Sequence, residues 1–172
     1  MRRIAKIIKV ASLITVLGIP AFAESSRGQE AWDFDSLAAT PAAPSANYLA
    51  AKEVNSMLDQ MAERWNAKDL EGYLSFYWLS PELVFVEDGI LMSGWDEVAG
   101  KYRRGFHDVS AMGRATMLRV HVKMLGPDKA YAVGQWTMVF AKTTVVGTDS
   151  AYIGRISGRW VIMFAHTSTI EM

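Results

Sequence analysis

The apolar residues of this chain change their spacing at Pro81, and that change limits the folds open to it. Before the proline, apolar residues recur with the 3.6-residue period of one helix face, at Val54, Met57, Leu58, Met61 and Trp65. After it, β-branched and aromatic residues follow the two-residue period of strands over most of the chain. Helices gathered on one side of an antiparallel sheet are the expected result, an α+β layered architecture.

Cap and turn residues divide the chain into three helices and six strands. Asp69 is placed to cap a second, shorter helix, and Ser93 is placed to cap a third. Asp88-Gly89 is a two-residue hairpin signal between strands at 83–86 and 90–92. Glycine-containing turns at 126–128, 147–148 and 157–158 then separate four long strands, expected at about 115–125, 130–144, 149–156 and 160–169.

A strongly bent antiparallel sheet wrapped on three N-terminal helices makes a cone, and the interior of a cone is a natural pocket. Apolar and aromatic side chains from both layers are candidates for its wall: Trp65, Tyr77, Trp95, Tyr102, Trp136, Met138 and Phe140. Stripes of this kind are also what any domain buries, so core packing and ligand binding both stay open as interpretations.

The last strand raises a question, because its apolar face ends in a histidine. In GRWVIMFAHTS, alternation puts Trp160, Ile162, Phe164 and His166 on one face. If that face is the concave one, His166 lies in the pocket, as a catalytic base or a group that hydrogen-bonds a ligand. The other interpretation is a structural histidine whose two nitrogens find partners in the core.

The N-terminal residues have the layout of a secretory signal peptide. Four basic residues precede an apolar run from Val10 to Ile19, and small residues follow up to Ala23. The run is shorter than the roughly 20 residues that cross a bilayer as a helix. We therefore expect a signal peptide over residues 1–23 and a periplasmic or secreted protein; an uncleaved anchor is the alternative. The Ala-, Ser- and Pro-rich residues 24–46 predict a flexible linker, and 47–172 a single domain.

Charge and composition exclude several functions. The chain has 18 basic and 18 acidic residues, and four of the basic ones lie in residues 1–23, so the mature protein carries a net charge of −4. That balance argues against nucleic acid or an anionic membrane as a partner. The chain has no cysteine, its three histidines are far apart, and no P-loop, dinucleotide, G-x-S-x-G or H-E-x-x-H motif occurs, so neither a metal nor a cofactor is predicted. Lys101, Arg103 and Arg104 form a basic cluster, either a solvated helix face or an anion-steering rim.

Three segments carry a family resemblance: NAKDLEGYLSFYWLSPELVFVEDG, SGWDEVAGKYRRGF and GRWVIMFAHTS. Over residues 48–170 the chain resembles the nuclear transport factor two-like superfamily, in the branch of small bacterial SnoaL-like and calcium/calmodulin-kinase association-domain-like proteins. The resemblance implies a cystatin-like cone fold. Its relatives include isomerases, dehydratases, cyclases, transport factors and assembly domains, so function must be argued from the site.

Two comparisons within the superfamily test candidate residues. Against ketosteroid isomerase, the catalytic tyrosine position falls on Met61, the base at or beside Asp88 and the second acid near Ser150. Asp88 is thus the candidate base in this comparison, and it also has a sufficient explanation as a hairpin-turn residue. Against the association domain, the closing pattern keeps His166, while Phe164 and Ala165 replace a histidine and an aspartate.

Three functions remain open. The chain is an exported protein that binds a small, mostly apolar or carboxylate-bearing molecule, or a cofactor-free lyase, isomerase or cyclase, or a non-catalytic dimerisation module. Strands such as 130–140 are apolar on both faces, and three helices cover only one, which predicts a homodimer through the outer face of the sheet.

Export gives the first testable prediction. Protein isolated from its native host should begin at Glu24, because the small residues before it form a signal-peptidase site. N-terminal sequencing measures this directly, and soluble protein that still begins at Met1 would contradict the prediction.

Overall fold

The computed structural model describes residues 45–171. The expected signal peptide, and the expected linker up to residue 44, lie outside the described residues. Among the residues described, no helix is both long and apolar enough to cross a membrane.

The described chain contains the three helices and six strands that the sequence predicts. The helices are α1 (Ala46–Asn66), α2 (Leu70–Leu74) and α3 (Trp95–Gly105), with a short 3-10 turn at Val109–Ala111. The strands are β1 (Val84–Glu87), β2 (Ile90–Ser93), β3 (Arg114–Gly126), β4 (Lys129–Val139), β5 (Thr144–Ile156) and β6 (Arg159–Glu171).

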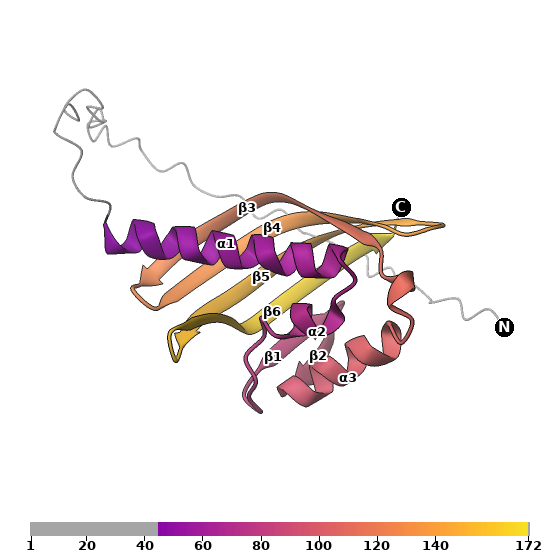
Figure 1. Cartoon of the computed structure of the whole chain (residues 1–172), viewed down its shortest axis with the longest axis horizontal. Coiled ribbons are helices and arrows are strands. Elements are labelled where there is room, and N and C mark those ends of the chain that lie inside the picture. The colour runs from indigo at the N-terminus through magenta and orange to yellow at the C-terminus, as the bar shows by residue number, and fades with distance from the viewer. Residues whose placement is uncertain (1–44, 172) are drawn as a thin grey trace, which may run out of the picture. The chain divides into compact units, whose positions relative to one another are not determined.

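The strands form one sheet in the order β2-β1-β6-β5-β4-β3. Every neighbouring pair is antiparallel except β1 and β6, which run parallel, so the sheet is mixed. Helix α1 lies across one face of the sheet and packs on β3, and α2 and α3 lie beside β1 and β2 (Figure 1). The α+β fold expected from the sequence is confirmed.

Two side-chain hydrogen bonds fix α1 against the sheet, one at Glu53 in its first half and one at Trp65 in its last turn. The Trp160 indole N–H of β6 donates to the Glu53 carboxylate at 2.9 Å, and the Arg155 guanidinium of β5 stacks on the Trp160 ring at 4.5 Å. In the last turn, the Trp65 indole N–H donates to the Gly113 carbonyl at 2.9 Å. The helix is thereby fixed at two points, 12 residues apart, over the sheet.

Two local predictions were wrong. Ser93 does not cap α3: it is the last residue of β2, Gly94 precedes the helix at φ +86°, and the Glu97 carboxylate accepts from the Ser93 N–H. Gly147 is not a turn residue but lies inside β5, and the chain turns at 140–143 instead. A Cβ at Gly147 would lie 2.2 Å from the Trp136 ring, so the glycine is there because the indole packs on the strand.

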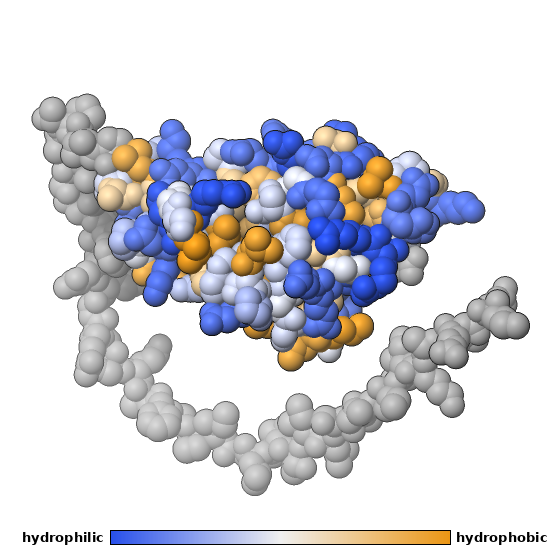
Figure 2. Space-filling view, turned by 60° about the horizontal axis from the view of Figure 1, so that its bottom comes forward, coloured by the Kyte–Doolittle hydropathy of each residue, from blue (hydrophilic) through white to orange (hydrophobic). Residues whose placement is uncertain are grey.

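The core forms two clusters of buried side chains, one centred on α1 and the sheet and the other on Trp65, Leu70, Leu74, Ala99 and Met112. The face shown in Figure 2 is mostly hydrophilic, with apolar side chains grouped in smaller areas. Leu79, Ile90 and Leu91 are among the exposed apolar residues.

Candidate functional site

A cavity of about 420 Å³ lies between the helices and the inner face of the sheet. Its floor is made by small side chains that the strand register sets in rows. Ala132, Ala151 and Ala165 are paired across β4, β5 and β6. The adjacent row is Gly134, Asp149 and Thr167. Because neither row carries a large apolar side chain, the space above them is left open.

Aromatic rings make most of the wall. Those from the helical layer meet edge to face: the Trp65 ring lies 5.0 Å from that of Tyr73 and 5.1 Å from that of Phe106. This geometry is favourable because a positive ring edge meets a negative ring face. The aromatic residues of the wall are Trp65, Tyr73, Tyr77, Phe85, Tyr102, Phe106, Trp136 and Phe140.

Three tyrosine hydroxyls meet in the helical wall of this cavity. The Tyr73 hydroxyl oxygen is 3.1 Å from that of Tyr77 and 3.5 Å from that of Tyr102. Burial raises the pKa of all three phenols, most strongly for Tyr77 and Tyr102. The three groups are therefore neutral at physiological pH, and each can donate and accept a hydrogen bond.

Asp149 is an acid on the otherwise small or apolar inner face of β5. Its carboxylate accepts a hydrogen bond from the Thr167 hydroxyl and another from the Trp136 side chain. Burial raises the pKa of Asp149 to about 6, against the lowering effects of the Trp136 hydrogen bond and the charge of His166. The carboxyl thus exchanges its proton close to neutral pH, as a group suited to acid–base chemistry does.

One ion pair belongs to the same cavity. Lys101 of α3 and Glu87 of β1 both line it and form a salt bridge with each other. Burial lowers the pKa of Lys101. Since this lysine already has an acidic partner, Asp149 has no cation of its own among the described residues that line the cavity.

Six of the seven predicted wall residues lie around the cavity: Trp65, Tyr77, Tyr102, Trp136, Met138 and Phe140. Trp95 does not. Its indole N–H donates to the Leu74 carbonyl at 3.3 Å, and the Arg103 guanidinium lies 5.2 Å from the centre of its ring. Trp95 therefore joins α3 to α2, and a role of the other six in ligand binding stays a prediction.

The placement of His166 in the pocket was wrong, because β6 is irregular. The pairing with β5 shifts between Tyr152 and Ile153, whose partners are Phe164 and Ile162, and Met163 is left over as a bulge. One extra residue reverses the faces beyond it. Trp160 and Ile162 are buried, whereas Phe164 is 37% exposed and Ala165 takes the buried position. His166 follows Phe164 to the outer face, where its Nε2 is 3.5 Å from the Ser168 hydroxyl.

Asp88 also lies outside the residues that line the cavity. It sits in the β1–β2 hairpin at φ +49°, next to Gly89 at φ +85°. Its carboxylate accepts from the Thr169 backbone N–H at 2.8 Å and from the Thr169 hydroxyl at 2.6 Å. These bonds tie the hairpin to β6, which is a sufficient structural reason for the aspartate.

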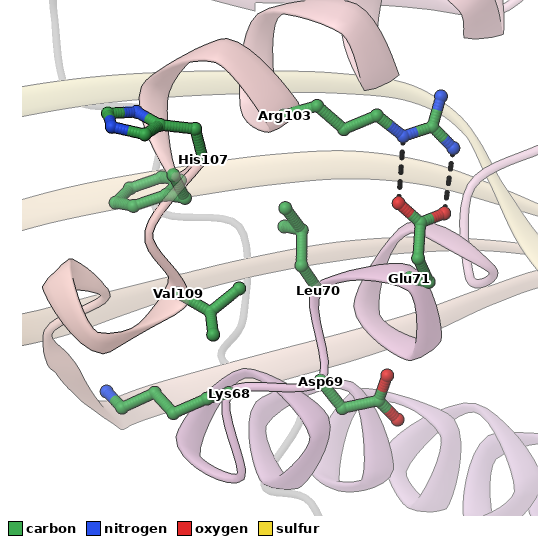
Figure 3. Close-up of a pocket in the computed structure, with 8 residues that line it drawn as sticks. Lys68, Asp69, Leu70, Glu71, Arg103, His107 and Val109 are labelled. Atoms are coloured by element: carbon green, nitrogen blue, oxygen red, sulfur yellow. Dashed lines mark hydrogen bonds and ion pairs between the residues drawn. The ribbon is translucent and has the colours of Figure 1, made fainter.

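A second, open hollow of about 400 Å³ lies at the junction of α2 and α3, where Leu70, His107 and Val109 surround it (Figure 3). Its charged groups are already engaged. The Arg103 guanidinium binds the Glu71 carboxylate through two bonds of 2.8 and 2.7 Å, and the Lys68 ammonium donates to the Gly113 carbonyl at 3.1 Å. The basic cluster of α3 is thus largely paired, since Lys101 and Arg103 both have acidic partners.

The sequence interpretation missed Tyr73 and Asp149. Tyr73 was not among the residues predicted for the wall, although it lines the cavity. Asp149 was hidden by the wrong turn at 147–148, which placed it at the start of a strand. When the sequence is read as one strand from Thr144, Asp149 falls between Gly147 and Ala151 on the inner face. An acid in that position is the signal that could have revealed the site.

Metal binding finds no support in the described part of the chain. No three histidine, aspartate or glutamate side chains there lie close enough together to hold a metal ion.

The bent sheet, the three helices and the internal cavity define a cone-shaped α+β protein. A crystal structure of an NTF2-like protein of unknown function from Shewanella oneidensis superposes with a TM-score of 0.65 at 30% sequence identity, covering 68% of this chain and 97% of that one. The chain belongs to the NTF2-like family.

More distant structures share the fold alone. A putative calcium/calmodulin-dependent protein kinase II association domain from Xanthomonas campestris is 14% identical, with a TM-score of 0.59 over 69% of this chain and 86% of that one. An NTF2-like superfamily protein from Salmonella enterica is 20% identical, with a TM-score of 0.58 over 70% and 90%. No protein-family model and no curated protein matches the sequence.

The raised pKa of Asp149 predicts how stability depends on pH. In the unfolded chain the carboxyl ionises near its ordinary pKa of ~3.9, and in the folded protein near 6. The unfolded state therefore loses its proton first, and the folded state loses about 3 kcal/mol of stability as pH rises from about 4 to above 6. Asp149→Asn should remove this loss, so the variant should be more stable than the wild type at about pH 8 and equally stable at about pH 4.

Urea unfolding of both proteins at each pH measures the difference. Thr167→Val is the matched control, because it removes one hydrogen bond to Asp149 and leaves the charge. A stability gap between wild type and Asp149→Asn that is the same at both pH values would contradict the prediction.

Proposed function

We propose that this chain is an exported protein that binds one small, mostly apolar molecule in the cavity of its cone. The observation that carries the proposal is the cavity itself, which is lined mostly by apolar and aromatic side chains and has a few polar groups. Pockets of a few hundred Å³ with apolar walls and a few convergent polar groups are typical small-molecule sites.

Four polar side chains of the cavity would orient the ligand. The hydroxyls of Tyr73, Tyr77 and Tyr102 come from the helical side and the Asp149 carboxyl from the sheet. A ligand whose apolar body packs on the rings can place a polar atom between these groups. Orientation then comes from hydrogen bonds and affinity from the apolar area removed from water.

A cofactor-free isomerase, lyase or cyclase is the second candidate, and one observation favours it. Asp149 has a pKa of about 6, close to the value at which a carboxyl works as general base and general acid at neutral pH. Native mass spectrometry of purified protein detects a co-purified small molecule. Incubating that molecule with the protein, and alone as a control, then separates the two candidates. An unchanged molecule supports binding, and a changed one supports catalysis.

A second copy of the chain is the partner we propose for the outer face of the sheet. Tyr131, Tyr152 and Phe164 are paired across β4, β5 and β6 on that face, and Tyr131 and Phe164 are 42% and 37% exposed. This aromatic row is continuous and carries no charge, as the centre of a dimer interface does.

Light scattering tests the dimer. The wild type should have twice the mass of one chain at micromolar concentration, and Phe164→Glu should shift it to a monomer, because it would bury a charge at the interface. Lys129→Glu is a charge-changing control at the exposed start of β4. A wild type that stays monomeric would contradict the proposal.

If the cavity is the binding site, a larger side chain placed in it should weaken ligand binding. Ala151 lies at the centre of the alanine row, so Ala151→Phe should place a ring in the open space. We expect the fold to be kept and binding of 4-phenylbutan-1-ol, a neutral apolar probe, to fall by roughly tenfold or more. Fluorescence of Trp65 and Trp136, which both line the cavity, reports the binding.

Thr116→Phe is the matched control, since it adds the same ring to an exposed position on the outer face of β3. It should leave binding of the alcohol unchanged. If Ala151→Phe is folded and binds the alcohol as tightly as the wild type, the cavity is not the binding site.

A further inference from the structure

The cavity has an uneven charge. Lys101 contributes one positive charge, and Glu87 and Asp149 contribute two negative charges above the pKa of Asp149. Because Lys101 and Glu87 are paired with each other, the remaining negative charge is that of Asp149.

The hydrogen-bond partners of Asp149 do not neutralise it. The Thr167 hydroxyl and the Trp136 indole are both uncharged donors. The charge of His166 favours the carboxylate, but burial disfavours it more. A buried carboxylate whose hydrogen-bond partners are neutral is costly, because the loss of hydration is only partly replaced. A positive charge brought by a ligand would supply the missing interaction.

The rest of the site has groups that favour a cation. Trp65, Tyr73, Tyr102, Phe106 and Trp136 present aromatic rings to the cavity, and a ring face attracts an ammonium group through its quadrupole. The tyrosine hydroxyls can accept hydrogen bonds, which an ammonium group donates. No arginine lines the cavity among the described residues, so nothing there offers a carboxylate a bidentate partner.

We infer that the cavity takes an organic ammonium ion, with its charged nitrogen beside Asp149 and its apolar body against the aromatic wall. This inference rests on the proposed function and names the ligand class of the same site. Of the two classes that the sequence suggests, apolar and carboxylate-bearing, the carboxylate would meet Asp149 as a like charge.

Three probes with one apolar body test the inference: 4-phenylbutylamine, 4-phenylbutan-1-ol and 4-phenylbutyrate. At about pH 8 the amine is protonated and Asp149 is ionised, so the amine should bind roughly tenfold or more tightly than the alcohol, and the carboxylate most weakly. Isothermal titration calorimetry on the full mature chain gives the three affinities.

Two changes should remove the preference. Asp149→Asn keeps the size of the side chain and removes its charge, so the amine and the alcohol should bind with similar affinity. Lowering the pH to about 5 protonates Asp149 and leaves the alkylamine protonated, so the wild type should lose the preference as well. The other titratable groups around Asp149 are His166 of β6, the Lys101–Glu87 pair and the three tyrosines. The Asp149→Asn variant separates the effect of Asp149 from the effects of these groups. The pH series needs only wild-type protein, so a preference that survives at about pH 5 overturns the inference even if the variant does not fold.

The outcomes separate the inference from the proposed function. If the alcohol binds and the amine binds no more tightly, or if the preference survives in Asp149→Asn and at low pH, the inference is wrong and the proposed function stands. If none of the three probes binds, both are wrong. If the carboxylate binds most tightly, the inference is wrong and the opposite ligand class is indicated.

Discussion

The small side chains on the inner face of the sheet are the constraint on which the rest of this structure depends. An α+β layer normally closes because large apolar side chains from the sheet fill the space beneath the helices. Here the register sets Ala132, Ala151 and Ala165 in one row and Gly134, Asp149 and Thr167 in the next. Helix α1 is held over the sheet by hydrogen bonds at Glu53 and Trp65, so the space above the two rows stays open and becomes a cavity.

The same constraint explains the electrostatics of the site. An acid in a well-packed core would need an ion-pair partner, whereas Asp149 faces an open space and is bonded by two neutral groups. Burial around the cavity raises the pKa of Asp149 and keeps the tyrosines opposite neutral. Lys101 and Glu87 pair with each other, so neither balances Asp149. A cavity with one unbalanced negative charge and aromatic walls is most complementary to an apolar cation.

The sequence predicts the layers and the wall well, and the polar part of the site poorly. The two apolar periods and the capping Asp69 depend on local spacing, so the helices, strands and six of the seven wall residues could be found without coordinates. His166 was misplaced because a single bulge at Met163 reverses the faces of β6, and a bulge leaves no mark in an apolar alternation. Asp149 was missed because Gly147 has the composition of a turn. Its reason for being glycine is the Trp136 ring from the next strand, a contact that only tertiary structure defines.

The ionisation of Asp149 is the most direct test of this account. Carbon-13 NMR of the Asp149 carboxyl across a pH titration reports that one group in the folded protein. The account predicts a pKa of about 6 in the free protein and a lower value once 4-phenylbutylamine is bound, because the ammonium charge stabilises the carboxylate. A pKa near the ordinary ~3.9 in the free protein, unchanged by the amine, would contradict the account.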